Sequence, residues 1–418
     1  MGKYKICGGR KLEGEIDVSG SKNSVLPILA ATLLNSSETC IYNCPKILDC
    51  MTMLEILKII GCEVIQQGNT VTVNSKTACD YKVPQKQVKE MRSSIIFLGA
   101  MLGRFKKTVI SYPGGCSLGA RPIDLHLKAL KQMGVEIKED DDFIICETEK
   151  IRGADIYLDF PSVGATENIM LAAVLAKGEA TVIHNAAREP EIVDLQNFLR
   201  AMGARVWGAG ESDIYIEGVE KLHSAEYEVM PDRIVAGTLL SAAAITGGEI
   251  LLNKARFEDI SAIISNFKKS GCKVEKTSKG IYLKTPKVLK SVDIIKTQPY
   301  PGFPTDMQPQ FSTLMTLAKG TSIIIETVFE SRYKYIEELI KMGADISVAE
   351  RTAVITGVNK LKAAQVSAMD LRGGAALILA GLAAEGTTVV ENSKHIERGY
   401  ESIEKDLTLL NADIIFDL

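Results

Sequence analysis

Cationic side chains recur at the starts of the helices that the sequence predicts. A helix N-terminus already carries a partial positive charge, so a lysine or arginine there is unfavourable unless an anion binds nearby. Guanidinium groups suit phosphates and carboxylates because they donate two parallel hydrogen bonds. The recurrence predicts a site for anionic ligands, although solvation would explain each charge taken alone. The positions are Lys22, Arg92, Arg121, Arg332, Arg372 and Arg398.

Cys116 lies in the glycine-rich stretch 112–127, which reads YPGGCSLGARPIDLHL and leads into an amphipathic helix. Gly-Gly and Pro-Gly permit backbone conformations that other residues avoid, so the stretch is predicted to be a mobile loop. Two interpretations of the thiol stay open. It packs as a small hydrophobic group, or the loop carries it to the anion site as a reactive group.

Asp306 lies in a proline-rich segment, 299–309. Because each proline fixes a backbone angle, the carboxylate is predicted to be held in place, as a general base requires. A helix N-cap is the structural alternative, and the two roles are compatible. The same alternative is stronger for Ser162 and Asp370, since serine and aspartate are ordinary caps.

Composition and charge narrow the class of protein. The chain has 418 residues and a net charge of -3, which gives no case for nucleic acid or an anionic membrane as a partner. Its apolar stretches are too short to span a bilayer and it shows no signal-peptide pattern, so a cytoplasmic location is expected. Nine irregularly spaced cysteines are expected to stay reduced, and the four histidines form no metal-binding pair. No Walker A, dinucleotide-binding or kinase motif occurs.

Six repeats of about 70 residues position these groups. Each repeat contains a helix end followed by a β-branched strand, and glycine or asparagine is expected at that end because a helix C-cap adopts a left-handed conformation. A second, almost wholly apolar helix in each repeat should be buried. Each repeat is predicted to run strand, buried helix, strand, outer helix, hairpin. The residues at the outer-helix ends are 68 to 73 positions apart: Gly61, Gly134, Gly203, Gly271, Gly343 and Asn411.

Two domains of three repeats are the economical arrangement, since the chain exceeds the size of a single core. The first domain is predicted to span residues 22–229, and the second to combine 1–21 with 230–418. The N-terminal strand region, 4–16, has no repeat of its own and is expected to pair with the second domain. The fold class is therefore α/β, and basic loops at corresponding ends of two domains would line a cleft for anions.

The chain resembles the UDP-N-acetylglucosamine 1-carboxyvinyltransferases, a family of enolpyruvyl transferases, over essentially its whole length. The motifs that carry the resemblance are GSKN, PGGCSLGARPIDLH, SVGATEN, NAAREPEI, YPGFPTDMQ, ESRY, DLRGGAA and HIERGYE, in that order. The resemblance implies a two-domain inside-out α/β barrel with three similar units per domain. It also implies an addition–elimination reaction in the first committed step of peptidoglycan synthesis, in which a sugar 3′-hydroxyl attacks phosphoenolpyruvate and phosphate is lost. No cofactor, metal, nucleic acid or membrane insertion is implied.

Residue roles also follow from the resemblance, position by position. The implied catalytic residues are Lys22, Cys116, Asp306 and Arg398. Lys22 would hold phosphoenolpyruvate, Asp306 would be the base near the 3′-hydroxyl, and Cys116 would react with phosphoenolpyruvate and the antibiotic fosfomycin. Relatives with aspartate at the Cys116 position resist that drug. The other implied substrate-binding residues are Asn23, Arg92, Arg121, Pro122, Ile123, Asp124, Leu125, Ser162, Val163, Val328, Arg332, Asp370 and Arg372.

Two other functions stay open on the sequence. A sister enzyme transfers the same group to shikimate 3-phosphate on the same fold, but it lacks the loop motif around Cys116. A non-catalytic paralogue would bind the UDP-sugar and regulate a partner. The intact set of Lys22, Cys116, Asp306 and Arg398 argues against that second alternative.

Overall fold

The chain divides into two compact units in a computed structural model that describes residues 2–113 and 123–417. The first unit contains residues 20–113 and 123–230, and the second contains residues 2–19 and 231–417. Three of the predicted site residues, Cys116, Arg121 and Pro122, lie outside the described residues. No helix within the described ranges is long and apolar enough to cross a membrane.

The first unit consists of three repeats. The first repeat contains α1 (Lys22–Ala31), η1 (Thr32–Asn35), β3 (Glu38–Tyr42), α2 (Leu48–Ile60), β4 (Glu63–Gln67) and β5 (Thr70–Asn74). The second contains α3 (Gln85–Glu90), η2 (Arg92–Ile96), α4 (Phe97–Phe105), β6 (Lys107–Ser111), α5 (Asp124–Gln132), β7 (Glu136–Glu139) and β8 (Phe143–Glu147). The third contains β9 (Asp155–Tyr157), α6 (Val163–Ala173), β10 (Ala180–His184), α7 (Pro190–Ala201), β11 (Arg205–Trp207) and β12 (Asp213–Glu217), and β13 (Glu226–Glu228) follows it.

The second unit begins with β1 (Lys3–Cys7) and β2 (Glu13–Asp17) and continues with three repeats. The fourth repeat contains α8 (Arg233–Ile245), β14 (Glu249–Asn253), η3 (Glu258–Ile260), α9 (Ser261–Lys269), β15 (Lys273–Lys276) and β16 (Gly280–Lys284). The fifth contains β17 (Ile294–Lys296), η4 (Thr305–Met307), α10 (Gln308–Met315), β18 (Thr321–Ile325), α11 (Ile336–Lys341), β19 (Asp345–Ala349) and β20 (Thr352–Thr356). The sixth contains β21 (Gln365–Ser367), α12 (Leu371–Ala383), β22 (Thr387–Glu391), α13 (Lys394–Glu397), α14 (Ile403–Leu409) and β23 (Asp413–Asp417).

Each repeat centres on one small sheet, which is mixed in every repeat except the second, where β6, β8 and β7 are antiparallel. In the third repeat the order is β11-β12-β10-β9, with β9 parallel to β10 and the other neighbours antiparallel. The fifth repeat has the same arrangement, β19-β20-β18-β17. A parallel neighbour requires a crossover, and the buried helix between the two strands supplies it. The predicted order of elements is present in full in the third and fifth repeats. Among the described residues, the second repeat has no named strand before its buried helix, and β13, β2 and β1 complete the sheets of the first, fourth and sixth repeats.

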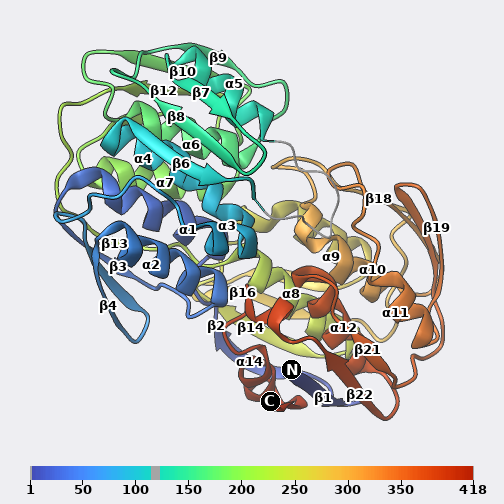
Figure 1. Ribbon diagram of the computed structural model, residues 1–418. Helices are drawn as coiled ribbons and strands as arrows, with labels where there is room; N and C mark the ends of the chain where they lie inside the picture. The colour runs from blue at the N-terminus through green and yellow to red at the C-terminus, as the bar shows by residue number, and fades with distance from the viewer. Residues whose placement is uncertain (1, 114–122, 418) are drawn as a thin grey trace. The chain divides into compact units, whose positions relative to one another are not determined.

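The N-terminal region completes two sheets of the second unit. The predicted strand 4–16 is in fact two strands, because the chain turns at Gly8 and Gly9, and Gly9 has a φ of 95°. β2 pairs in parallel with β14, and β1 is inserted between β22 and β23. β1 therefore takes the place that the second hairpin strand has in other repeats. Figure 1 shows β1 beside β22, with both chain ends in this unit.

The apolar helices are buried, as predicted. In the second unit every residue of α8 and α10 is buried, and α8, α10 and α12 contact one another. In the first unit α4 packs against α6, and a Cβ on Gly99 would lie only 2.2 Å from the Asn168 carbonyl oxygen. Glycine at this position therefore permits the two helices to approach closely.

The predicted C-cap conformations are also confirmed. All six residues that end or follow the outer helices have positive φ, from 76° to 103°. Asn411, the one that is not glycine, has a φ of 76°. Asparagine tolerates this left-handed region better than most residues with a side chain.

Candidate active site

Asp306 and two arginines form one hydrogen-bonded group in the second unit. Arg332 Nη2 lies 3.0 Å from Asp306 Oδ1. Arg372 donates to the other oxygen, with its Nε 3.2 Å and its Nη2 2.9 Å from Oδ2. The Arg332 and Arg372 side chains are 1% and 4% exposed, whereas that of Asp306 is 27% exposed. The carboxylate is therefore the part of the group that a ligand reaches most easily.

Three loops of the fifth and sixth repeats position this group. Asp306 lies in η4, directly before the buried helix α10, and Arg332 lies between β18 and α11. Arg372 is in the first turn of α12. Asp370 caps that helix, since its Oδ1 accepts hydrogen bonds from the amides of Arg372 and Gly373, both at 2.9 Å. The N-cap that was the structural alternative for Asp370 is thus present, and it fixes the turn that carries Arg372.

The two guanidinium groups control the charge state of Asp306. Burial alone would raise the pKa of its carboxyl group, but Arg372 and Arg332 outweigh burial and hold the pKa well below its usual range. Burial would likewise lower the pKa of Arg372, and the nearby Asp306 carboxylate raises it instead. A carboxylate stabilised in this way is a weak proton acceptor. With both arginines in contact, Asp306 is therefore too weakly basic for the predicted role of general base.

A series of buried hydrogen bonds links Arg372 to the interior of the second unit. Arg372 Nη1 donates to the Tyr400 hydroxyl at 3.4 Å, and that hydroxyl lies 2.9 Å from Thr238 Oγ1. Gln310 Nε2 donates to the same threonine oxygen at 3.0 Å. Thr238 lies on α8, Gln310 on α10 and Tyr400 after α13. These hydrogen bonds therefore connect all three repeats of the second unit to the guanidinium group of Arg372.

Val328 and Arg398 occupy two further loops of the second unit. The Val328 amide donates to Glu326 Oε1 at 2.8 Å, so this predicted substrate neighbour uses its N–H group within the protein. Arg398 directly follows α13 and is half-buried. Burial, and then the positive charge of Arg398, lower the pKa of the nearby His395.

Lys22 forms a buried ion pair in the first unit. Its Nζ lies 2.7 Å from Asp49 Oδ2, and the two side chains are 10% and 3% exposed. Lys22 begins α1 and Asp49 lies in the first turn of α2, so the pair joins the two helices of the first repeat. Asn23, the next residue of α1, is half-buried. The predicted phosphoenolpyruvate-binding cation is thus held by an internal carboxylate.

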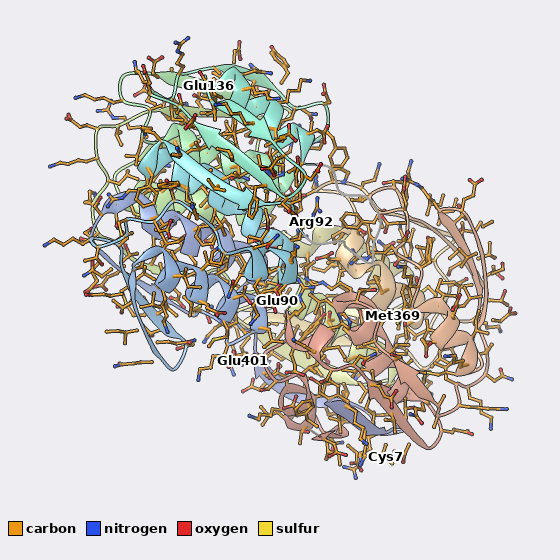
Figure 2. The ribbon with its side chains drawn as sticks, viewed as in Figure 1. Cys7, Glu90, Arg92, Glu136, Met369 and Glu401 are labelled. Atoms are coloured by element: carbon orange, nitrogen blue, oxygen red, sulfur yellow. The ribbon has the colours of Figure 1, made fainter. Side chains whose placement is uncertain are left out.

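A hollow of about 820 Å³ opens in the first unit beside Arg92. Arg92 follows α3 and starts η2 (Figure 2). Ile123 and Asp124, at the start of α5, line the same hollow, together with Lys128 and Lys131 of that helix. The hollow therefore brings together three of the predicted site residues. Its three cationic side chains outnumber the two acidic ones that line it, Asp124 and Glu139, and this balance slightly favours an anionic ligand.

His126, on α5, is hydrogen-bonded to Asn168 of α6. Asn168 Oδ1 accepts from the Gly99 amide at 2.6 Å, so its Nδ2 is the end that donates to His126 Nδ1, at 2.8 Å. The imidazole is therefore neutral, with its proton on Nε2. Burial lowers the pKa of His126 to about 4, and the charge of Arg92 acts in the same direction.

Leu125, Ser162 and Val163 lie at the starts of α5 and α6, two helices that pack together. Ser162 Oγ accepts a hydrogen bond from the Ala165 amide at 3.3 Å, which is the N-cap named as its structural alternative. Leu125 and Val163 are half-buried. Within residues 2–113 and 123–417, no group of three or more histidine, cysteine, aspartate or glutamate side chains is placed to share a metal ion.

Comparison with known proteins identifies the family. A family model described as "EPSP synthase (3-phosphoshikimate 1-carboxyvinyltransferase)" matches residues 6–407. UDP-N-acetylglucosamine 1-carboxyvinyltransferase 1 of Carboxydothermus hydrogenoformans is 49% identical over 414 residues, 99% of this chain and 98% of that protein. UDP-N-acetylglucosamine 1-carboxyvinyltransferase 2 of Caldanaerobacter subterraneus subsp. tengcongensis is 56% identical over 415 residues, 99% of each. The chain belongs to the UDP-N-acetylglucosamine 1-carboxyvinyltransferase family.

Solved structures of enolpyruvyl transferases share its fold. The enolpyruvyl transferase NikO from Streptomyces tendae has a TM-score of 0.88 at 24% identity, covering 99% of this chain and 98% of that one. EPSP synthase from Acinetobacter baumannii has a TM-score of 0.76 at 19% identity and covers 100% of both chains. The predicted inside-out α/β barrel of six repeats is confirmed.

Four residues of this enolpyruvyl transferase escaped prediction although they lie beside predicted site residues: Asp49, His126, Glu326 and Tyr400. His126 and Tyr400 stand inside the motifs PGGCSLGARPIDLH and HIERGYE, so a closer reading of the motifs could have found them. Asp49 and Glu326 stand outside the quoted motifs. Asp49 contacts Lys22, and Glu326 accepts from Thr297 and Thr305, across 21 to 29 residues of chain, and such contacts leave no local signal in the sequence.

Proposed function

We propose that the chain transfers the enolpyruvyl group of phosphoenolpyruvate to the 3′-hydroxyl of UDP-N-acetylglucosamine and releases phosphate. The observation that carries this proposal is the 56% identity, over 99% of each chain, to a relative of that name. The hydroxyl oxygen would bond to C2 of phosphoenolpyruvate while C3 gains a proton. The adduct would then lose phosphate and a C3 proton, which restores the double bond as an enolpyruvyl ether. The product would enter peptidoglycan synthesis, and through it cell-wall growth, cell shape and division.

The group around Asp306 suits this chemistry because it holds a base and two cations within hydrogen-bonding distance. An anionic ligand that recruits Arg372 or Arg332 would remove part of the charge that stabilises the carboxylate. The pKa of Asp306 would then rise toward its usual value, and the base would gain strength only when the anion is bound. Cations near a departing phosphate also stabilise the charge that develops there.

The other predicted residues would bind the two substrates. Lys22, Arg398, Arg332 and Arg372 would hold phosphoenolpyruvate, with Asp370 fixing the last of these. Asn23, Val328 and Asp306 would lie beside the sugar. The remaining set would contact the phosphates and the uridine: Arg92, Arg121, Pro122, Ile123, Asp124, Leu125, Ser162 and Val163.

Cys116 would serve as the proton donor to C3. Its thiolate would also attack the epoxide of fosfomycin, breaking a carbon–oxygen bond and forming a stable thioether, while the oxygen takes up a proton. Fosfomycin should therefore label this residue covalently and stop turnover.

The test is phosphate release from phosphoenolpyruvate with two acceptors in turn. The description of the matching family model favours shikimate 3-phosphate as the second candidate acceptor. We expect release with UDP-N-acetylglucosamine, none with shikimate 3-phosphate, and inhibition by fosfomycin. Release with shikimate 3-phosphate alone would reverse the assignment. Binding of the UDP-sugar without any release would identify a non-catalytic paralogue.

A further inference from the structure

Glu326 is a fully buried carboxylate that accepts four hydrogen bonds. It directly follows β18 and is 0% exposed. Its Oε1 accepts from the Thr297 hydroxyl at 2.8 Å, the Val328 amide at 2.8 Å and the Phe329 amide at 3.2 Å. Its Oε2 accepts from the Thr305 hydroxyl at 2.8 Å. All four donors are neutral, and no lysine or arginine among the described residues forms an ion pair with it.

Two of these donors belong to the segments that carry the candidate catalytic group. Thr305 is the residue directly before Asp306 and lies with it in η4. Phe329 lies three residues before Arg332, and the Arg332 guanidinium carbon lies 5.3 Å from the centre of the Phe329 ring. The two oxygens of one carboxylate thus hold the backbone on both sides of the Asp306–Arg332 ion pair.

The third donor anchors the carboxylate to the sheet. Thr297 follows β17, and its hydroxyl also accepts a hydrogen bond from the Thr327 amide at 2.8 Å. The Thr327 hydroxyl returns a bond to the Thr297 carbonyl at 2.6 Å. Glu326 therefore stands on a rigid base formed by the parallel strands β17 and β18. Through its carboxylate, Glu326 therefore links these two strands to the segments that carry Asp306 and Arg332.

We infer that Glu326, acting through Thr305 and Phe329, is a positioning residue that sets the distance between Asp306 and Arg332 for enolpyruvyl transfer. The inference rests on the proposed function for the reaction that it names, but its geometry can be tested separately. A carboxylate suits this role because it accepts from several donors at once and cannot donate. Burial in a low-dielectric site strengthens each of these charge-assisted bonds.

The kinetic test uses Thr305, because the threonine side chain can be altered without emptying the site. Thr305→Val keeps the shape and removes the hydroxyl, so we expect kcat to fall at least about tenfold, in the range usual for displaced catalytic groups. Thr305→Ser keeps the hydroxyl and should restore most of kcat. In an Asp306→Asn background, Thr305→Val should have little further effect, because the two act as a unit. Full kcat in Thr305→Val, or additive losses in the double variant, would overturn the inference.

A crystal structure tests the same inference without any activity. In Thr305→Val and in Glu326→Gln we expect the Asp306 Oδ1 to Arg332 Nη2 contact, 3.0 Å in the wild type, to be broken or to take two arrangements. An unchanged contact in both variants would overturn the positioning role, even if the wild-type enzyme transferred the enolpyruvyl group to a substrate other than UDP-N-acetylglucosamine. Conversely, a wild type that fails to release phosphate from UDP-N-acetylglucosamine and phosphoenolpyruvate would overturn the proposed function alone.

Discussion

Arg372 donates two hydrogen bonds to a single oxygen of Asp306, through Nε at 3.2 Å and Nη2 at 2.9 Å. Arg332 takes the other oxygen, so both sides of the carboxylate are occupied by cations. The same contacts that make Asp306 a weak base place two guanidinium groups beside it, and such groups suit phosphates and carboxylates. Anion binding and base strength are therefore properties of one cluster, and changes to any member should affect both.

Replacement of Asp306 by asparagine should remove the proton acceptor while keeping the size of the side chain. We expect kcat for phosphate release to fall by about 10²- to 10⁴-fold, the usual contribution of a general base. Asp293→Asn is the matched control, since Asp293 is exposed in the same repeat and should leave kcat unchanged. A kcat for Asp306→Asn within twofold of the Asp293→Asn value would rule out the base role.

Replacement of Asp49 by asparagine should remove the carboxylate that lies 2.7 Å from the buried ammonium group of Lys22. Breaking a buried pair in this way costs about 3 kcal/mol of folding free energy, which urea unfolding would measure. The exposed pair of Lys177 and Glu220 provides the control, because Glu220→Gln should cost less than about 1 kcal/mol. Equal losses of unfolding free energy in the two variants would show that burial does not strengthen the contribution of the Lys22–Asp49 pair to stability.

Tyr400→Phe should loosen Arg372 without removing any charge. The variant loses the acceptor for Arg372 Nη1 and the link to Thr238, so we expect KM for phosphoenolpyruvate to rise and stability to fall by about 1 kcal/mol. Tyr282→Phe removes a comparable hydroxyl, which donates a hydrogen bond to Glu249 in the sheet of the fourth repeat, and should leave KM unchanged. A Tyr400→Phe enzyme with unaltered KM would show that Arg372 does not depend on this contact.

His126 should make the protein less stable as the pH falls from 6.5 to 4. The unfolded imidazole takes up a proton near pH 6.5, whereas the folded one stays neutral until about pH 4. The unfolded state therefore binds more protons in this window, and stability rises with pH, by on the order of 3 kcal/mol from this group. Unfolding of wild type and His126→Gln at several pH values measures the difference, with the exposed His223→Gln as control. The same slope in all three proteins would contradict the assignment.

Cys116→Ser should abolish covalent labelling by fosfomycin and most of the turnover, because a hydroxyl is a far weaker acid and nucleophile than a thiol. Cys116→Asp should keep activity, since a carboxyl group can donate the proton, and should also resist labelling. Mass spectrometry after incubation with fosfomycin reads the label, and Cys79→Ser serves as the control, since Cys79 is an exposed cysteine. Normal turnover by Cys116→Ser would refute the role of the thiol as the acid.

The repeat architecture could be predicted because its signals are local. Glycine or asparagine after an amphipathic helix, followed by β-branched residues, identifies a helix end and a strand within one short window. Asn411 illustrates this, since its residue type alone suggested the left-handed φ that the structure has. The place of β1 between β22 and β23 could be predicted only as far as the domain it joins. Its register depends on residues almost the whole length of the chain away.

The contacts within the candidate site could be predicted only in part. The types of Asp306, Arg332 and Arg372 marked them as functional, but 66 residues separate Asp306 from Arg372, and no pattern in the sequence pairs them. Glu326 was missed for the same reason: its hydroxyl donor Thr297 lies 29 residues earlier. Long-range hydrogen bonds arise from the packing of whole repeats, and a single sequence carries no direct record of them.

The most direct test of the account is the structure of the reaction product. Phosphoenolpyruvate and UDP-N-acetylglucosamine would be incubated with the enzyme, and the UDP-sugar isolated and examined by mass spectrometry and carbon-13 NMR. The account predicts one enolpyruvyl group per sugar, joined through an ether at the 3′ oxygen, with one phosphate released for each product formed. An unmodified UDP-sugar, or an enolpyruvyl group at any other oxygen, would contradict it.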